Sequence, residues 1–257
     1  MKGADFAHEL EVFRGEAESA AQFLYAYLAV CATMSEHRPV LDLMNRTTLF
    51  WATSLGALQQ SAFIALGRIF DQDRKSKHNV DRLLRLAQDN RHIFSKKALG
   101  RRKEEVSSNA SEWLPAYLRR AYEPTVHDFR RLRAHVRKWR RVYEKNYRPI
   151  RHQVFAHKAI SDRSVTAELF AKTNIREMQR LSTFLCSLHE ALWQLFNNGY
   201  RPVLRPQRYS VKRMRDRPSP KGRGDAVQER IACEAERFLL AAANVPKRRS
   251  RAASHQE

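Results

Sequence analysis

The sequence predicts an all-α protein: an antiparallel helical bundle with a basic C-terminal extension. Glycine and proline are scarce, with 8 and 9 among 257 residues, so few turns are marked. Apolar residues recur at three- and four-residue steps through most of the chain, which is the spacing of one helix face. The sequence has no long alternation of apolar and polar residues, the pattern typical of a half-buried strand. We therefore expect helices and no sheet.

The first half of the chain is expected to hold two long helices and several shorter ones. Apolar residues at helical spacing predict the first long helix over about residues 5–34, and Pro39 lies in the break that follows. The second is expected from Leu41 or Thr47 to Phe70. Shorter helices are expected over residues 80–88 and, on either side of 107–109, within residues 94–123.

The second half begins with a strongly basic helical stretch, residues 125–158, in which Pro149 either kinks one helix or starts a second. After a loop at 161–164, Asn174 and Glu177 stand three apart, as in a capping box, and Gly199 ends the long helix that follows. A basic segment containing four prolines comes next, and then a lone amphipathic helix over about 225–243. We expect three segments: a bundle (1–199), a linker or arm (200–224), and a helix with a basic tail (225–257).

An uncharged stretch of 21 residues, 47–67, is long enough to cross a bilayer. Gln59 and Gln60 fall together beyond its middle, and amides in hydrocarbon would need partners. We interpret the stretch as a central helix of a soluble bundle and predict no membrane span.

Cysteine usage and the absence of common motifs narrow the chemistry. The three cysteines form no C-x-x-C pair, which predicts neither a zinc site nor a disulfide framework and fits a cytoplasmic protein (Cys31, Cys186 and Cys233). Glycine-rich phosphate loops, G-x-S-x-G and H-E-x-x-H are missing from the sequence, which argues against NTPases, serine hydrolases and zinc proteases. We expect no metal and no cofactor.

The charge balance predicts a polyanionic partner. Lys and Arg number 48 against 27 Asp and Glu, a formal net charge of +21. Ten of these basic residues lie between Arg130 and Arg151, with Glu144 as the one acid. Like charges three and four apart destabilise a helix, so a nearby phosphate backbone explains the run better than a solvated face. The candidates for nucleic-acid binding are Arg137, Lys138, Arg140, Arg141, Lys145 and Arg148.

A cluster of arginine and histidine closes this run. Arg148, Arg151 and His152 are three and four apart and share a helix face. His157 lies about 9 Å further along the axis than Arg151 and roughly 120° around it, so one helix cannot easily bring both to one atom. Two copies related by a two-fold axis could, which predicts a homodimer. His152 and His157 are five apart, which is wrong for two metal ligands on one helix face.

Arginine and histidine in a basic groove suit the cleavage of RNA. Histidine can take the proton of a 2′-OH near neutral pH, and arginine can stabilise the charge that builds on the phosphorus oxygens. The products would carry 2′,3′-cyclic phosphate ends, and no metal is needed. The alternative for His157 is a helix-terminal histidine that interacts with the helix dipole.

The same residues resemble a known family. R-H-x-x-x-x-H at 151–157 is similar to the motif of the HEPN superfamily, and IRHQVFAHK and QSAFIALGRIFD (residues 60–71) resemble its AbiU-like branch, which is tied to abortive phage infection. The resemblance covers roughly residues 6–199. It implies a HEPN-like helical bundle that dimerises and is often a metal-independent ribonuclease, acting as a toxin or phage-defence effector. An antitoxin protein is the implied candidate partner.

The resemblance also implies roles for three residues. Arg151 would stabilise the transition state, His157 would transfer the proton, and His152 would be the polar residue beside the arginine. Pro149 and the basic arm depart from the family pattern. Two other hypotheses stay open: a non-catalytic HEPN-like module that binds nucleic acid or acts as a scaffold, and a membrane-surface protein that uses the arm on anionic lipid.

Overall fold

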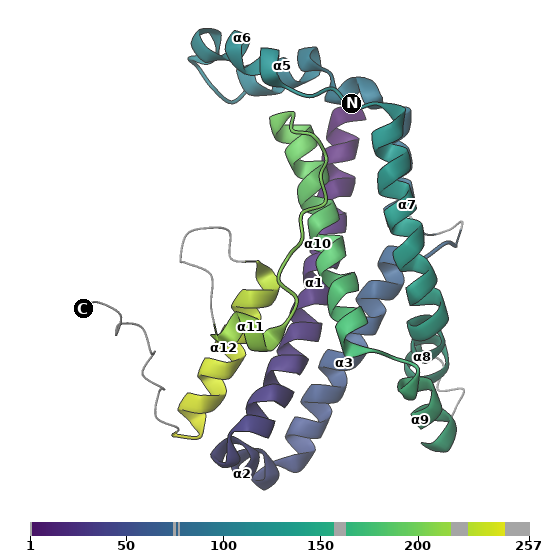
Figure 1. The fold of residues 1–257 in the computed structure, drawn as a ribbon, viewed down its shortest axis with the longest axis vertical. Helices are drawn as coiled ribbons and strands as arrows, with labels where there is room; N and C mark the ends of the chain where they lie inside the picture. Colours follow the sequence, from purple (N-terminus) through teal and green to yellow (C-terminus); the bar gives the residue numbers. More distant parts are fainter. Residues whose placement is uncertain (1, 74–75, 77, 157–162, 217–225, 245–257) are drawn as a thin grey trace, which may run out of the picture. The chain divides into compact units, whose positions relative to one another are not determined.

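The computed structural model describes residues 2–73, 76, 78–156, 163–216 and 226–244 (Figure 1). These residues are mostly helical and contain no strand, which confirms the predicted all-α class. Their contacts divide the chain into two compact units. Unit 1 comprises Met1–Ala21 and Gln60–Tyr209, and unit 2 comprises Gln22–Gln59 and Ser210–Glu257. The two long helices over residues 2–36 and 48–70 each have one end in unit 1 and the other in unit 2. The boundaries of the two units therefore differ from those of the three expected segments.

The helices follow the expected order, with differences at three places. Pro39 lies in the first turn of a separate short helix instead of in a break, and a further helix includes Arg163 and Ser164, which were expected in a loop. Residues 211–216 of the expected arm are also helical. The elements are α1 (Lys2–Glu36), α2 (Arg38–Arg46), α3 (Thr48–Phe70), α4 (Val80–Asp89), η1 (Arg91–Phe94), α5 (Lys96–Glu104), α6 (Ala110–Arg120), α7 (Val126–Val142), η2 (Tyr143–Tyr147), α8 (Arg148–Ile150), η3 (Arg151–Ala156), α9 (Arg163–Ala171), α10 (Ile175–Asn198), α11 (Val211–Asp216) and α12 (Val227–Ala242).

Within unit 1, α10 runs antiparallel to α7 and to the first part of α1 (Figure 1). An aromatic cluster fills the core at one end: the ring of Phe6 lies 5.1 Å from those of Phe94 and Phe196. Arg102 lies over the Phe196 ring and donates hydrogen bonds to the carbonyl oxygens of Ile93 and Phe196. This side chain therefore satisfies a carbonyl in the last turn of α10, which the helix itself leaves without a partner.

Helix ends in unit 1 follow the sequence signals closely. The Asn174 side chain accepts hydrogen bonds from the amides of Arg176 and Glu177, and Gly199 adopts φ +60°, as its position after α10 predicts. Only half of the expected capping box forms, because the Glu177 carboxylate instead accepts a hydrogen bond from Asn146. A capping box does form at the start of α7, between Thr125 and Asp128.

The chain after α10 does not leave the bundle at once. Arg131 of α7 donates a hydrogen bond to the carbonyl of Pro202, and Ser187 of α10 donates one to the carbonyl of Arg205. Residues 201–209 therefore run back along α10, and the first part of the expected arm belongs to unit 1 (Figure 1).

The helix α3, which holds most of the uncharged stretch, differs from a buried central helix in its first half. Its later residues, from Ala62 to Phe70, are mostly buried, whereas Leu49 is 80% and Phe50 63% exposed. By length and composition α3 could cross a membrane, although such a helix is weak support for a span.

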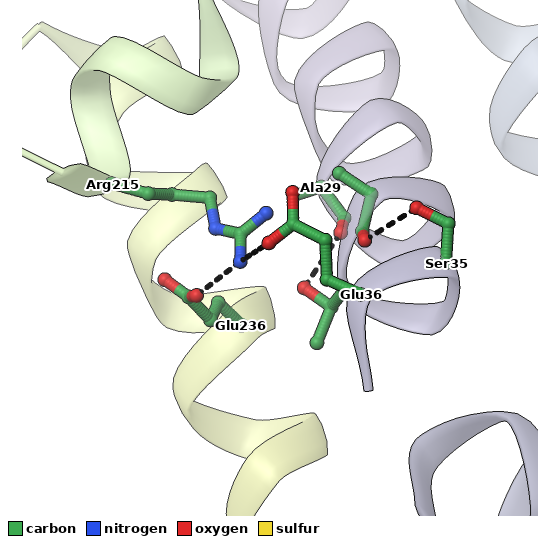
Figure 2. A network of polar contacts seen from close by, with 7 residues as sticks. Ala29, Ser35, Glu36, Arg215 and Glu236 are labelled. Carbon is green, nitrogen blue, oxygen red and sulfur yellow. Dashed lines mark hydrogen bonds and ion pairs between the residues drawn. The ribbon is translucent and has the colours of Figure 1, made fainter. Parts of the chain in front are cut away.

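In unit 2, α12 covers an apolar cluster formed by α1, α2 and α3. Leu239 of α12 is buried against Val30, Val40 and Met44. Arg215 of α11 lies between two carboxylates, Glu36 at the end of α1 and Glu236 of α12, and pairs with both (Figure 2). Burial disfavours the charge of Arg215, but its hydrogen bonds and ion pairs with the two carboxylates outweigh burial and raise its pKa.

We expect Arg215→Ala to lower the free energy of unfolding by about 1 to 3 kcal/mol, because it leaves two facing carboxylates without their cation. Urea denaturation measures the change. Arg213→Ala, an exposed arginine on the same short helix, is the matched control and should change stability by less than about 0.5 kcal/mol. Equal effects of the two substitutions would contradict a specific role for the Arg215 ion pairs.

Candidate functional site

The basic stretch folds as one helical run with two wide turns. α7 continues into a π-helical segment, η2, then into the single turn α8 and a second π-helical segment, η3. The wide hydrogen bond of η2 joins the amide of Arg148 to the carbonyl of Tyr143, five residues earlier. π-helical turns are rare, and they occur frequently at functional sites.

Pro149 lies in the first turn of α8, which begins at Arg148 within the continuous helical run. Proline has no amide hydrogen, and in a regular helix its ring clashes with the carbonyl four residues earlier. The π-helical turn that ends one residue before α8 changes the hydrogen-bond spacing here. The chain therefore continues as a helix beyond Pro149 and carries Arg151 and His152 with it.

A polar cleft of about 440 Å³ lies where this run meets the end of α3. It brings together Arg148, Arg151 and His152, which were predicted to share one helix face. The opposite wall comes from the end of α3 and the chain just after it. The lining residues are Gly67, Phe70, Asp71, Gln72, Asp73, Tyr143, Glu144, Arg148, Arg151 and His152.

Arg151 lies directly against the backbone of α3 at Gly67. A β-carbon added to Gly67 would come within 2.2 Å of Nε, 2.4 Å of Cδ and 2.6 Å of Cζ of Arg151. Such distances are far inside van der Waals contact, so this position of the guanidinium requires a residue without a side chain. Gly67 therefore forms a slot, which leaves the space that the Arg151 side chain occupies.

The neighbours of Arg151 in the cleft are polar or aromatic. Its Nη1 lies 3.4 Å from Nε2 of His152, and because a guanidinium can only donate, this contact needs an Nε2 that carries no proton. The Asp71 carboxylate accepts a hydrogen bond from the amide of Asp73, so it shapes the turn after α3 while it also lines the cleft.

Tyr143 forms the buried end of the cleft. Its ring stacks on Phe70, with 5.2 Å between the ring centres, and the residue is only 2% exposed. Burial raises the pKa of the Tyr143 hydroxyl, and the positive charges of Arg151 and Arg148 oppose that shift without cancelling it. The side chain is therefore a neutral phenol at physiological pH.

Most of the predicted nucleic-acid-binding residues are exposed. The exposed ones are Arg137, Lys138, Arg141, Lys145 and Arg148. Arg140 differs: it is 8% exposed, and its Nη2 lies 2.5 Å from Asp81 of α4. Because this guanidinium is paired inside unit 1, Arg140 joins α7 to α4, and we leave it out of the candidate nucleic-acid interface.

The described residues bear on two further predictions, the role of His157 and the absence of a metal site. His157 lies outside the described residues, which end at Ala156 and resume at Arg163. Across the described ranges, no group of three or more His, Cys, Asp or Glu side chains could hold a metal ion. Of the residues that line the cleft, only Arg148, Arg151 and His152 were predicted as site residues from the sequence. The others, among them Gly67, Phe70 and Tyr143, were not.

Comparison with known proteins yields one family. The family model HEPN_AbiU2, described as AbiU2, matches residues 3–215. The match includes every described residue of the cleft and stops in α11, before α12. Neither the curated proteins nor the solved structures gave a match to the chain.

We expect Gly67→Ala to displace Arg151 and therefore to fail to stabilise α3, although alanine is normally the better helix former. Gly56→Ala, on the same helix with nothing within 4 Å of the new β-carbon, should raise the free energy of unfolding by about 0.5 to 1 kcal/mol. Gly67→Ala should instead fail to raise it, because Arg151 must move away from the new β-carbon.

Urea denaturation of both variants in the Arg151→Ala background is the decisive comparison. With the guanidinium gone, Gly67→Ala should become as stabilising as Gly56→Ala. If the penalty at Gly67 persists without Arg151, the slot is not what makes glycine necessary there.

Proposed function

The chain belongs to the HEPN_AbiU2 family of abortive-infection HEPN-type proteins, and on that premise we propose that it is a metal-independent endoribonuclease. One observation carries this proposal: Arg151, the arginine of the family-like motif, is held in a slot at Gly67 inside a polar cleft, beside His152. The cleft can accept a phosphate, because Arg148 and Arg151 both line it. Arginine matches the geometry of phosphate oxygens better than lysine does.

The proposed reaction is transesterification within the RNA. The 2′-oxygen attacks the adjacent phosphorus while a base takes the 2′-OH proton, and the bond from phosphorus to the 5′-oxygen breaks. The leaving 5′-oxygen receives a proton, so the products are a 2′,3′-cyclic phosphate and a 5′-hydroxyl. Arg151 would stabilise the negative charge on the phosphorus oxygens, and His157 would transfer the proton.

His152 supports Arg151 in this proposal. Its Nε2 faces a nitrogen of the guanidinium and can accept a hydrogen bond from it. His152 would therefore help to orient Arg151, while the role of proton transfer goes to His157, which the motif places six residues beyond Arg151.

The exposed basic residues of α7 and η2 would hold the RNA strand that leads into the cleft. Arg137 and Arg141 are one helical turn apart and both exposed, so they face the same side of α7. Lys138, Lys145 and Arg148 extend this surface toward the cleft residues. Neutralising several phosphates in this way gives affinity without sequence preference.

We further propose that the chain acts as a homodimer, in the cytoplasm, as a toxin or phage-defence effector that an antitoxin protein could restrain. The proposed dimer rests on the six-residue separation of Arg151 and His157, which a two-fold axis would overcome by pairing the residues of two copies. A strict monomer in sedimentation that still cleaves RNA would remove this part of the proposal.

We expect the full-length protein to cleave RNA in excess EDTA and to leave 2′,3′-cyclic phosphate ends. Arg151→Ala and His157→Ala should each slow cleavage roughly 100-fold or more, because they remove charge stabilisation and proton transfer. His127→Ala, an exposed histidine at the start of α7, is the matched control and should cleave like the wild type. Tight RNA binding by all four proteins with no cleavage would instead favour the non-catalytic binding module.

We expect the affinity for single-stranded RNA to fall with salt, and the exposed arginines of α7 to account for part of that dependence. Each lost phosphate contact should reduce the slope of log K against log salt by about 0.7. Replacing Arg137 and Arg141 together by alanine should therefore lower the slope by about 1.4. The matched control replaces Arg119 and Arg120, an exposed pair at the end of α6, and should leave the slope unchanged.

A further inference from the structure

The hydroxyl of Tyr143 is buried, and no hydrogen bond of standard geometry reaches it from the described residues. The Arg151 side chain lies within interaction range of it. We propose that Tyr143 is a positioning residue for catalysis: its hydroxyl accepts a hydrogen bond from the Arg151 guanidinium and fixes that group for the reaction. This inference rests on the proposed ribonuclease function and adds to it a residue outside the R-H-x-x-x-x-H motif.

The π-helical segment is what brings Tyr143 to Arg151. In a regular α-helix, eight residues turn about 800°, so the two side chains would lie roughly 80° apart around the axis. A π-helical turn contains more residues and therefore turns less per residue, and η2 spans Tyr143–Tyr147 between them. The wide turn removes most of the offset, and both residues line the same cleft.

The surroundings of Tyr143 favour Arg151 as the hydrogen-bond donor to its hydroxyl. One side of the phenol stacks on the Phe70 ring, and Gly67 contributes no side chain. A buried hydroxyl without a well-formed hydrogen bond is unfavourable, and the Arg151 side chain is a hydrogen-bonding neighbour of this hydroxyl. The Arg151 side chain already fills the space that a β-carbon at Gly67 would take, so it lies against α3.

The chemistry of the phenol suits this role. Burial raises the pKa of Tyr143, so the ring oxygen stays protonated and neutral. A neutral hydroxyl can accept from the guanidinium while leaving its full positive charge available to a phosphate. The negative charge of Asp71 also reaches this hydroxyl and contributes to its raised pKa.

The test compares Tyr143→Phe with Tyr147→Phe, two substitutions that each remove one hydroxyl from η2 and keep the ring. Tyr147 is the matched control, because its hydroxyl donates to the carbonyl of Asn174 and it does not line the cleft. Tyr143→Phe should lower the single-turnover rate of RNA cleavage roughly 10- to 100-fold, with RNA affinity unchanged within about twofold. Tyr147→Phe should lower the unfolding midpoint and leave the cleavage rate within about threefold of the wild type.

A double-mutant cycle tests whether Tyr143 acts through Arg151. In the Arg151→Ala background, Tyr143→Phe should slow cleavage no further. A wild-type rate for Tyr143→Phe would overturn the proposal, as would an equal loss of rate with and without Arg151.

A second readout does not depend on ribonuclease activity. In a ¹H–¹⁵N spectrum of the full chain, the Nε–Hε signal of Arg151, identified by its loss in Arg151→Ala, should move in Tyr143→Phe and stay in place in Tyr147→Phe. If the wild type cleaves no RNA but the signal moves, the ribonuclease proposal fails and the contact between Tyr143 and Arg151 stands. If the signal stays in place in Tyr143→Phe, the positioning role is overturned.

Discussion

The cleft depends on one close approach, that of the Arg151 side chain to the backbone of α3 at Gly67. Any β-carbon at this position would occupy the space that the guanidinium fills. The end of α3, the turn after it and the helical run from α7 to η3 therefore meet at a fixed place, with the arginine between them. Phe70, one turn further along α3, then stacks on Tyr143 and closes the buried end.

Much of the fold could be predicted from the sequence because its signals are local. Scarce glycine and proline, helical spacing and the caps at Asn174 and Gly199 each act within a few residues, and the corresponding helices are present. What the sequence did not predict is non-local. Glu177 has a suitable position for a capping box, but Asn146, 31 residues away, uses its carboxylate. Segment 201–209 resembles a free arm until hydrogen bonds to α7 and α10 are seen.

The candidate site was predicted in part, for the same reason. Arg148, Arg151 and His152 could be grouped because they lie within one turn or so of each other on a single helix. Tyr143 could not be grouped with them, because in a regular helix its side chain would lie on a different face. The π-helical turn places it on the same side as Arg151. Gly67 gave no signal of its own, since a glycine in an apolar helix does not reveal which side chain lies against it. In the sequence Arg140 is indistinguishable from its basic neighbours, and only the structure shows that it is buried and paired with Asp81.

The segment that matches the family ends at Arg215, the residue that ties α12 to α1, whereas α12 itself lies beyond the match. Yet α12 covers Val40 and Met44, which are almost fully buried. A chain shortened to the matched segment would place these side chains in water, next to a helix α3 that already exposes Leu49 and Phe50. We expect such a chain to be less soluble unless another apolar helix takes the place of α12. The solubility of the matched segment, residues 3–215, would then depend on a helix that lies outside it.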